Sequence, residues 1–503
     1  MRRLTLAISV VSTLSVGCLV GLSGPAAAAE TVSVPSSGSL AVTGHGYGHG
    51  RGLSQYGAQG GALRGATAAQ ILAFYYPGTV ATTVPSALLR VQMTANAGRP
   101  VAVSSFTGLR VRDAATGATT SLTTAYPMWR ISYSTTYKYL LQYLSGSSWH
   151  TLRTSANALG FVGGYTIRLW PTAATTVDFR SVASSGYRGE MRAVWTGSSL
   201  ITVNYVLMDL YLRGVVPRES PASFPAAALQ SQAVAARSYS AYQRAAHASS
   251  SFDVYDTTRD QVYGGYLRYA TATSSPTYYE HPNTDAAIAA TANGARSYGG
   301  KVIFAQFSSS NGGFSSDGGK PYLRAAADPY EAYSSSPYKT WTTSAAVSSL
   351  RSVAGLKTLS RMVVSRETSS GGHVATIAFT GTNSANSAVT VTKTGSQLRS
   401  YFGWRSPYFS FSTGSTDGGP TGAWPLVADQ IFAYSGSSRV INGSDAQARF
   451  RPYIAAIQRE VGVAQTSRYD SATVTGVSRW QGLVGLPQNG IVDSRTWQVM
   501  TVR

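Results

Sequence analysis

The pattern of residue types changes along the chain, and this change sets the fold class. Between residues 84 and 206, short runs of β-branched and aromatic residues are separated by Gly, Asn and Ser, as at 165–170, 191–195 and 200–206. Such runs predict antiparallel strands. Residues 226–246 are instead an Ala-rich helical stretch. We therefore predict an α+β protein with a β-rich main part and a few helices.

Shorter elements are predicted around this main part. Ser223 can cap the helix at 226–246, and Pro225 suits its first turn. Residues 30–43 are predicted to be a polar leader. Further helices are predicted at 66–75 and 284–291, and further strands at 302–307 and 373–379.

A second unit is predicted at the C-terminus. Residues 411–424 are rich in Gly, Ser and Thr, which indicates a linker. The following residues, 425–503, are predicted to form a small three-helix domain. The evidence is a helical apolar stripe followed by two capping aspartates: Ile454, Ile457, Val461, Asp470 and Asp493.

The N-terminus predicts export. Arg2 and Arg3 precede an apolar, charge-free stretch and then small residues, so residues 1–29 are predicted to be a secretory signal peptide rather than a membrane anchor. Cys18, the single cysteine, lies inside this signal, which excludes disulfides from the mature chain. No later apolar run reaches the roughly 20 residues of a membrane helix. We expect a secreted, extracellular protein without a membrane span.

The charge balance favours an anionic polymer as partner. The chain has 41 Lys and Arg against 21 Asp and Glu, a net charge of +20. The excess comes from scarce acids, and no Lys or Arg run of the kind that binds nucleic acid is present. A diffuse positive surface therefore favours another anionic polymer over nucleic acid.

Residues 44–57 form a Gly-rich segment that contains His49, Ser54, Gln55 and Tyr56. Its spacing fits neither a dinucleotide-binding fingerprint nor a nucleophile elbow. Dense glycine lets a backbone approach a ligand closely, and these side chains offer neutral hydrogen bonds and an aromatic face. That combination suits a sugar. The alternatives are a structural turn and, for the histidines of the segment, a metal site.

Glu219 lies between Pro217 and Pro221 in a chain with few acids. Prolines restrict the backbone on both sides, so the side chain is aimed reproducibly at a predicted strand-to-helix corner. This position favours a catalytic acid, with a structural ion pair as the alternative. Arg218 would favour the ionised carboxylate, whereas burial against Phe224 would raise its pKa.

Three other places carry candidate chemistry. Arg237 could steer a carboxylate, orient Glu219 or form a structural ion pair. Asn311 lies in a polar turn that could bind a ligand or serve as a plain loop. The acids at 253–260 invite a cation-site interpretation, but the interleaved Val and Tyr favour a half-buried strand pair.

Several long segments together resemble the sporulation stage II protein D family, also called the SpoIID/LytB domain. The segments that carry the resemblance are residues 215–219, 227–239, 256–263, 310–313 and 48–58. The resemblance covers residues 44–410 except for residues 80–190, which do not match the family and are predicted to be a β-rich insertion or subdomain. It implies a lytic transglycosylase of peptidoglycan in which the glutamate that matches Glu219 is the catalytic acid and base.

The chain departs from the family pattern in three ways. The Gly-His-Gly segment, usually C-terminal in the domain, opens the mature chain here, which resembles a circular permutation. Family members that bind zinc use Cys and His where this chain has Tyr255, Arg259 and Asp260, so we expect no metal and no other cofactor. Arg218-Glu219-Ser220 replaces the common Glu-Met.

The C-terminal unit is similar to the peptidoglycan-binding-like three-helix domain. Residues 469–470, 480–481, 485–486, 490–493 and 496–497 fall at the spacing of that family. Both resemblances point to the bacterial cell wall.

The resemblance implies a secreted wall protein that binds peptidoglycan glycan strands, cleaves them and leaves anhydro-muramic ends. Substrate binding is expected from His49, Ser54, Gln55, Tyr56, Arg237 and Asn311. The alternative is a non-catalytic enhancer of an N-acetylmuramoyl-L-alanine amidase, which would make a wall amidase a partner. A third possibility is a pure wall-binding scaffold.

Overall fold

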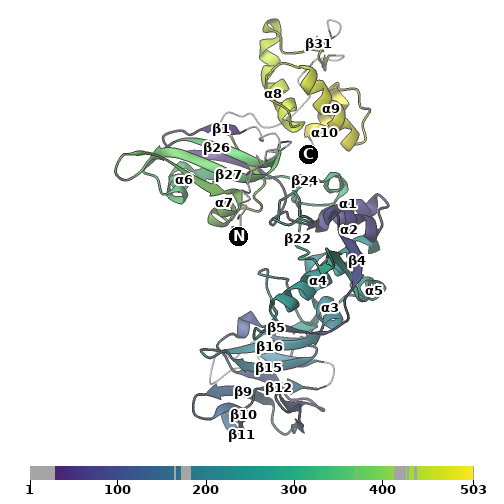
Figure 1. Cartoon of the computed structure of the whole chain (residues 1–503), viewed down its shortest axis with the longest axis vertical. Helices are drawn as coiled ribbons and strands as arrows, with labels where there is room; N and C mark the ends of the chain where they lie inside the picture. The colour runs from purple at the N-terminus through teal and green to yellow at the C-terminus, as the bar shows by residue number, and fades with distance from the viewer. Residues whose placement is uncertain are drawn as a thin grey trace, which may run out of the picture.

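The computed structural model describes residues 29–163, 166–170, 183–369, 371–412, 426, 430–435 and 439–501. Figure 1 shows an elongated arrangement, with a β-rich unit at one end, a group of helices in the middle and the C-terminal helices at the other end. The predicted signal peptide, apart from Ala29, and residues 413–424 of the predicted linker lie outside the described residues.

The β-rich unit consists of two sheets that share one core. The eight-stranded sheet has the order β11 (Ser148–Ser155), β10 (Lys138–Ser145), β9 (Met128–Ser134), β6 (Val101–Ser104), β13 (Ile167–Trp170), β14 (Ser184–Tyr187), β18 (Leu267–Tyr269), β19 (Thr277–Tyr278). The seven-stranded sheet has the order β17 (Val254–Tyr255), β5 (Leu88–Gln92), β16 (Leu200–Leu207), β15 (Glu190–Trp195), β12 (Leu159–Val162), β7 (Arg110–Asp113), β8 (Thr119–Ser121). Trp129 of the first sheet and Phe161 of the second lie buried in the same core. Each of the two sheets contains strands from residues 80–190 and strands that come later in the chain. The predicted insertion is therefore part of the same β-rich unit.

Three helices connect this unit to the middle of the molecule: α3 (Met208–Glu219), α4 (Ala226–Ala246) and α5 (Pro282–Ala290). Helix α4 has its predicted bounds, but the prediction that Ser223 caps it is wrong, because its N-cap is Pro225 and no side chain caps it. Phe224 precedes a proline and therefore disfavours the helical conformation. Ala236 joins the core of the two sheets, whereas Leu229 joins a second core. Helix α4 thus links the two cores.

The second core lies under the N-terminal helices α1 (Gln55–Leu63) and α2 (Ala68–Tyr75). Thr67 begins α2 with a reciprocal capping box, close to the predicted start. The remaining elements here are β3 (Leu53–Ser54), β4 (Val80–Thr83), β20 (Gly294–Tyr298), β21 (Lys301–Val302), β22 (Phe307–Ser308), β23 (Phe314–Ser315), β24 (Ala326–Ala327) and the 3₁₀ helix η2 (Pro329–Tyr333). The prediction of one strand over 302–307 is wrong, because Ala305 and Gln306 donate to carbonyls two residues back and form turns.

A third core lies in a module built from residues 30–44 and 341–412, which is called the third module below. Its sheets have the orders β1 (Glu30–Ser33), β26 (Thr358–Thr368), β27 (Gly371–Thr382), β28 (Ala388–Thr394), and β25 (Trp341–Ala346), β2 (Ser39–Gly44), β29 (Phe409–Ser412). Helices α6 (Val347–Ala354) and α7 (Gly395–Phe402) pack on them. The predicted strand at 373–379 lies inside β27.

The prediction of a polar leader at 30–43 is wrong, because these residues contain β1 and β2. Strand β2 alternates exposed and buried residues, and Leu40 and Val42 are fully buried in the third core. A strand with one buried face is predicted from apolar residues at every second position. Here only Leu40 and Val42 follow that pattern, among Ser, Thr and Gly, so the sequence did not predict a strand. Residues 29–44 are therefore structural.

The C-terminal module contains the three predicted helices, α8 (Arg451–Glu460), α9 (Ser471–Leu483) and α10 (Ser494–Thr501). Ile454 and Ile457 are fully buried, and Asp470 and Asp493 accept backbone N–H groups of the helices they precede. A short ladder of β30 (Ile431–Phe432) and β31 (Val440–Ile441) and the 3₁₀ helix η3 (Asp445–Phe450) precede them. The α+β class and the helical C-terminal domain are confirmed.

Candidate functional site

Glu219 is the last residue of α3. The expected strand-to-helix corner is therefore a helix-to-helix corner, because α3 lies between β16 and Glu219. Ser220 has the extended angles φ −125° and ψ 133°. The residue before a proline disfavours the helical conformation, so Pro221 ends α3 immediately after Glu219. Pro217 lies inside α3 and Pro221 follows its end, so Glu219 extends from a helix end between the two prolines.

Two N–H groups from distant segments hold the Glu219 carboxylate. The backbone N–H of Val262 donates to Oε1 at 2.8 Å, and the side-chain amide of Gln55 donates to Oε2 at 3.1 Å. Burial nevertheless raises the pKa of Glu219, because these two bonds and Arg218 offset the desolvation only in part. The sequence left open whether Arg218 lowers the pKa of Glu219 or burial raises it. In the structure burial has the larger effect. The Arg218 guanidinium lies over the ring of Tyr279, 4.7 Å from its centroid.

Gln55 is placed by the start of α1. The Oγ of Ser54 accepts the N–H of Gly57 at 3.1 Å and so caps the helix, and the same hydroxyl donates to Oε1 of Glu331 at 2.5 Å. Ser54 is fully buried. Its expected role in substrate binding is therefore replaced by a structural one. The adjacent residues Ser54 and Gln55 thus donate hydrogen bonds to two different carboxyl groups, those of Glu331 and Glu219.

Glu331 belongs to a buried polar cluster that sequence analysis missed. Its Oε1 also accepts the backbone N–H of Asn311 at 3.0 Å, and the Asn311 side chain donates to Asp328 at 2.7 Å. The hydroxyl of Tyr75 donates to the same Asp328 oxygen at 2.7 Å. Burial, reinforced by Asp328, raises the pKa of Glu331 to about 7. Asn311 was expected to bind substrate, but it is fully buried in this cluster. It ties its own loop to the carboxyl groups of Glu331 and Asp328.

His49 and Tyr56 have different surroundings. Burial, together with the neighbouring Arg51, Arg399 and His373, lowers the pKa of His49 to about 3, so its ring is neutral. The half-buried ring of Tyr56 meets the ring of Phe224 edge-on, with centroids 5.3 Å apart. Of the predicted sugar-binding side chains, Tyr56 therefore offers an aromatic face beside Gln55, and the roles of His49 and Tyr56 stay predictions.

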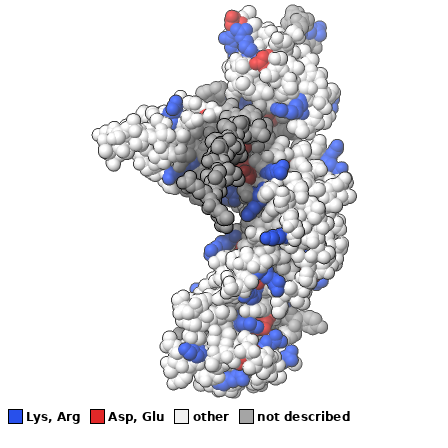
Figure 2. Space-filling view, in the orientation of Figure 1, with Lys and Arg blue, Asp and Glu red and all other residues white. Residues whose placement is uncertain are grey.

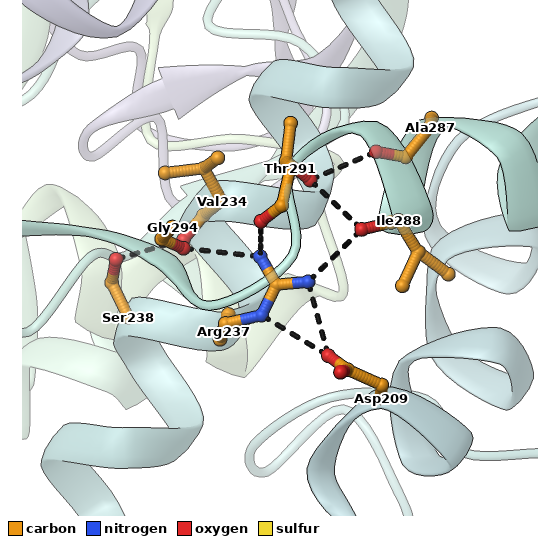
Figure 3. Close-up of polar contacts among 8 residues, drawn as sticks. All are labelled: Asp209, Val234, Arg237, Ser238, Ala287, Ile288, Thr291 and Gly294. Carbon is orange, nitrogen blue, oxygen red and sulfur yellow. Dashed lines mark hydrogen bonds and ion pairs between the residues drawn. The ribbon is translucent and has the colours of Figure 1, made fainter. Parts of the chain in front are cut away.

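Arg237 is an internal structural residue, as Figure 3 shows. All five of its N–H donors are used: two bond the carboxylate of Asp209, and the others bond the carbonyls of Ile288, Thr291 and Gly294. The side chain is 1 % exposed. The prediction that Arg237 binds substrate is therefore contradicted. The residue ties α3 and α4 to α5 and the loop after it.

The acids at 253–260 also have structural partners. Asp253 pairs with Arg90 at 2.5 Å, and Asp260 accepts the Tyr239 hydroxyl at 2.7 Å. The guanidinium of Arg259 stacks over the ring of Tyr255, 3.7 Å from its centroid. A stacked cation does not fit a metal site. Within the described residues, no group of three or more His, Cys, Asp or Glu side chains could hold a metal ion.

Sequence reasoning missed the contact of Gln55 with Glu219 and the whole Glu331 cluster. The contacts of Gln55 with Glu219 and of Ser54 with Glu331 join residues that lie more than 160 positions apart. Local motifs carry no information on such contacts. One signal was available for Glu331, because the scarcity of acids that drew attention to Glu219 applies to Glu331 as well.

The comparisons with known proteins match two parts of the chain. Residues 196–298 match the family model of the stage II sporulation protein, SpoIID, and residues 454–500 match the model of a putative peptidoglycan-binding domain. The first match contains Glu219, α4 and Val262. The two resemblances found in the sequence are therefore confirmed.

Two curated relatives match as well. The amidase enhancer of Bacillus subtilis is 37 % identical over 123 residues, which are 23 % of this chain and 15 % of that protein. An uncharacterized protein of Brachyspira hyodysenteriae is 33 % identical over 134 residues, which are 26 % of this chain and 36 % of that protein. The chain thus covers well under half the length of either relative.

The structural role of Arg237 predicts a loss of stability. Arg237→Gln should lower the free energy of unfolding by about 3 kcal/mol, because it breaks a buried ion pair and leaves buried carbonyls without donors. Arg244→Gln, on an exposed position of the same helix, should change it by less than about 0.5 kcal/mol. Chemical denaturation would measure both. A fully stable Arg237→Gln with weakened glycan binding would contradict the structural role.

The Glu331 cluster predicts that stability falls as the pH rises. The pKa of this carboxyl is about 7 in the folded chain against 4.5 for an ordinary glutamate, so the folded state holds the proton more tightly. The stabilisation is fully present below pH 4.5 and is lost as the pH rises through about 7. Melting temperatures across this range should fall in the wild type and change less in Glu331→Gln. An equal slope in both proteins would contradict this assignment.

Proposed function

We propose that this chain is a secreted cell-wall protein that cleaves the glycan strands of peptidoglycan as a lytic transglycosylase. The family matches support a role at peptidoglycan, and the C-terminal domain supports association with the wall. Export rests on the predicted signal peptide. In the described residues no helix is long and apolar enough to cross a membrane.

The observation that carries the proposal is the environment of Glu219. Its carboxyl is largely buried, its pKa is raised, and two N–H donors fix its orientation. A raised pKa means that the carboxyl keeps its proton to a higher pH than an ordinary glutamate does, which suits a general acid. The hydrogen-bond donors hold the same group in place when it is ionised.

One carboxyl group suffices for this reaction. Protonated Glu219 would donate its proton to the glycosidic oxygen between N-acetylmuramic acid and N-acetylglucosamine. As the glycosidic bond breaks, the resulting carboxylate would take the proton of the muramic acid's own hydroxyl, whose oxygen attacks the anomeric carbon. The product is an anhydro ring, and no water is consumed. Glycoside hydrolysis usually needs a second carboxyl opposite the first, and among the described residues no carboxylate contributes to the raised pKa of Glu219.

The surface charge is compatible with an anionic wall polymer. Figure 2 shows Lys and Arg scattered over one face of the molecule, with few Asp and Glu among them. Peptidoglycan carries carboxylates on its muramic acid and peptide groups. A diffuse positive surface would therefore favour adhesion to the wall and make it sensitive to salt.

The first test replaces the acid. Glu219→Gln keeps the shape and loses the proton, so release of anhydro-muramic products from purified glycan strands should fall at least about 100-fold. Glu367→Gln is a matched control, because Glu367 also has a raised pKa and two donors, Ser316 and Asp317, but lies in the third module. Its rate should equal that of the wild type. Undiminished product release by Glu219→Gln would refute the assignment.

The second test changes the positioning of the acid. Gln55→Met keeps the approximate volume but removes a hydrogen bond that lowers the pKa of Glu219. The pKa should therefore rise, and the alkaline limb of the pH–rate profile should move to higher pH. A structural role alone would lower the rate at every pH and leave the position of this limb unchanged.

A second candidate function is enhancement of a wall amidase, and the relative named amidase enhancer favours it. In that case glycan strands alone would give no anhydro-muramic product. The chain would instead accelerate peptide release by an N-acetylmuramoyl-L-alanine amidase, and Glu219→Gln would accelerate it equally. Adding the amidase to the same assay separates the two functions.

A further inference from the structure

Two buried carboxyl groups lie against the first turn of α1. Asp328 is the N-cap of η2 and Glu331 lies in its first turn, and each residue is 4 % exposed. Neither carboxyl has an ion pair with a cation in the described part of the chain. Both groups lie outside the two segments that match known families. The search for a further role therefore starts from their neutral hydrogen-bond donors.

The first turn of α1 is in direct contact with these carboxyl groups. Ser54, the N-cap of α1, donates to Oε1 of Glu331 at 2.5 Å. A Cβ on Gly57 would lie 2.7 Å from Oδ2 of Asp328, so only glycine lets the turn pack this closely. Asn311 joins the pair, since its backbone N–H bonds Glu331 and its side-chain amide bonds Asp328. The start of α1 therefore has a fixed support on this side.

Gln55, the first residue of α1, connects this support to Glu219. Its side-chain amide donates to Oε2 of Glu219 at 3.1 Å, near the long end of the ordinary range of about 2.7–3.2 Å. A displacement of the first turn by a few tenths of an ångström would stretch the bond beyond that range. The path from Glu331 to Glu219 consists of two hydrogen bonds and the peptide bond between Ser54 and Gln55.

A direct effect of the charge of Glu331 on Glu219 would have the opposite sign to an effect through Gln55. Burial is the main cause of the raised pKa of Glu219, the hydrogen bond of Gln55 lowers it, and the charge of Glu331 takes no part. A negative charge nearby would raise that pKa, so its removal would lower it. Loss of the hydrogen bond would raise it instead. The other titratable groups that interact with Glu331 are those of Asp328, Tyr75 and Tyr56.

We propose that Glu331 is a positioning residue for Glu219, because it fixes Ser54 at the start of α1 and thereby holds Gln55 against the acid. Glu331 takes no part in the chemistry of the substrate. This inference rests on the proposed function, in which Glu219 is the general acid and base. The buried cluster thus has a second role beside stability. While the contact of Ser54 is intact, the amide of Gln55 stays on Glu219 and keeps the pKa of that carboxyl from rising further.

The test compares two replacements of Glu331 in the full-length chain. Glu331→Leu removes the acceptor of the Ser54 hydroxyl, whereas Glu331→Gln keeps a side-chain oxygen that can accept it. Both replacements remove the charge, so a difference between them reports the hydrogen bond.

The pKa of Glu219 is read from the carboxyl NMR signals of isotope-labelled glutamate during a pH titration. Its signal is assigned by its absence from Glu219→Gln. Relative to Glu331→Gln, Glu331→Leu should raise the proton affinity of Glu219 about fivefold, because the hydrogen bond of Gln55 is weakened. The alkaline limb of the pH–rate profile should move to higher pH in the same variant.

A double variant tests whether Gln55 carries the effect. Gln55→Met already removes the bond to Glu219, so the addition of Glu331→Leu should raise the pKa of Glu219 no further. A further rise as large as in the single variant would overturn the inference. Equal pKa values of Glu219 in Glu331→Leu and Glu331→Gln would overturn it too, because Glu331 would then have a structural role alone.

Two further variants keep the test decisive. If Glu331→Leu does not fold, Ser54→Ala removes the same contact from the other side and should raise the pKa of Glu219 above its wild-type value. Glu367→Leu is the matched control, because Glu367 accepts hydrogen bonds from Ser316 and Asp317 in the third module. It should leave the pKa of Glu219 unchanged. An equal rise in this control would overturn the inference, since the pKa would then follow general destabilisation.

The NMR measurement needs no cleavage, so failure of this inference and failure of the proposed function can be told apart. If the wild type releases no anhydro-muramic product but Glu331→Leu raises the pKa of Glu219, the positioning role stands and the transglycosylase is rejected. If the wild type releases product but the pKa of Glu219 is the same in Glu331→Leu and Glu331→Gln, the transglycosylase stands and the positioning role is rejected.

Discussion

The hydrogen bonds of Ser54 and Gln55 are the contacts on which the candidate site depends. Ser54 donates to Glu331 and Gln55 donates to Glu219, so one short segment is fixed at two carboxyl groups from different parts of the chain. Ser54 also caps α1, which sets the direction of the helix that starts at Gln55. A shift of this segment would leave Glu219 with the N–H of Val262 alone and Glu331 buried without its hydroxyl donor, which is unfavourable. The site therefore holds together through a few buried polar bonds.

Glycine allows this segment to lie close enough to its neighbours. Gly46 has a φ of 78°, and a Cβ there would lie 2.6 Å from the carbonyl oxygen of Ser310. Tyr47 and Ser310 exchange backbone hydrogen bonds next to it. The Gly-rich composition that suggested close approach to a ligand thus serves first the approach of one backbone to another. The expected contact of Tyr56 with a sugar stays a prediction.

The features that could be predicted from the sequence are those that depend on neighbours in the chain. Helix α4, the capping aspartates of the C-terminal domain and the fixed direction of Glu219 follow from local spacing and from proline. The structural roles of Ser54, Asn311 and Arg237 could not be predicted, because a polar side chain that binds a sugar and one that satisfies a buried group look the same in a sequence. Only burial separates them, and burial is set by contacts between distant residues. Strand β2 was missed for a related reason, since its pairing partners, β25 and β29, lie about 300 and 370 residues away.

The burial of Glu219 bears on the choice between enzyme and enhancer. A carboxylate in a partly buried place lowers stability, because it loses water, and its raised pKa is the measure of that loss. A glutamine at this position could accept the same N–H of Val262 without any charge to desolvate. A carboxyl whose pKa is raised by burial, and whose oxygens accept hydrogen bonds from Gln55 and Val262, is the arrangement expected of the proposed general acid and base.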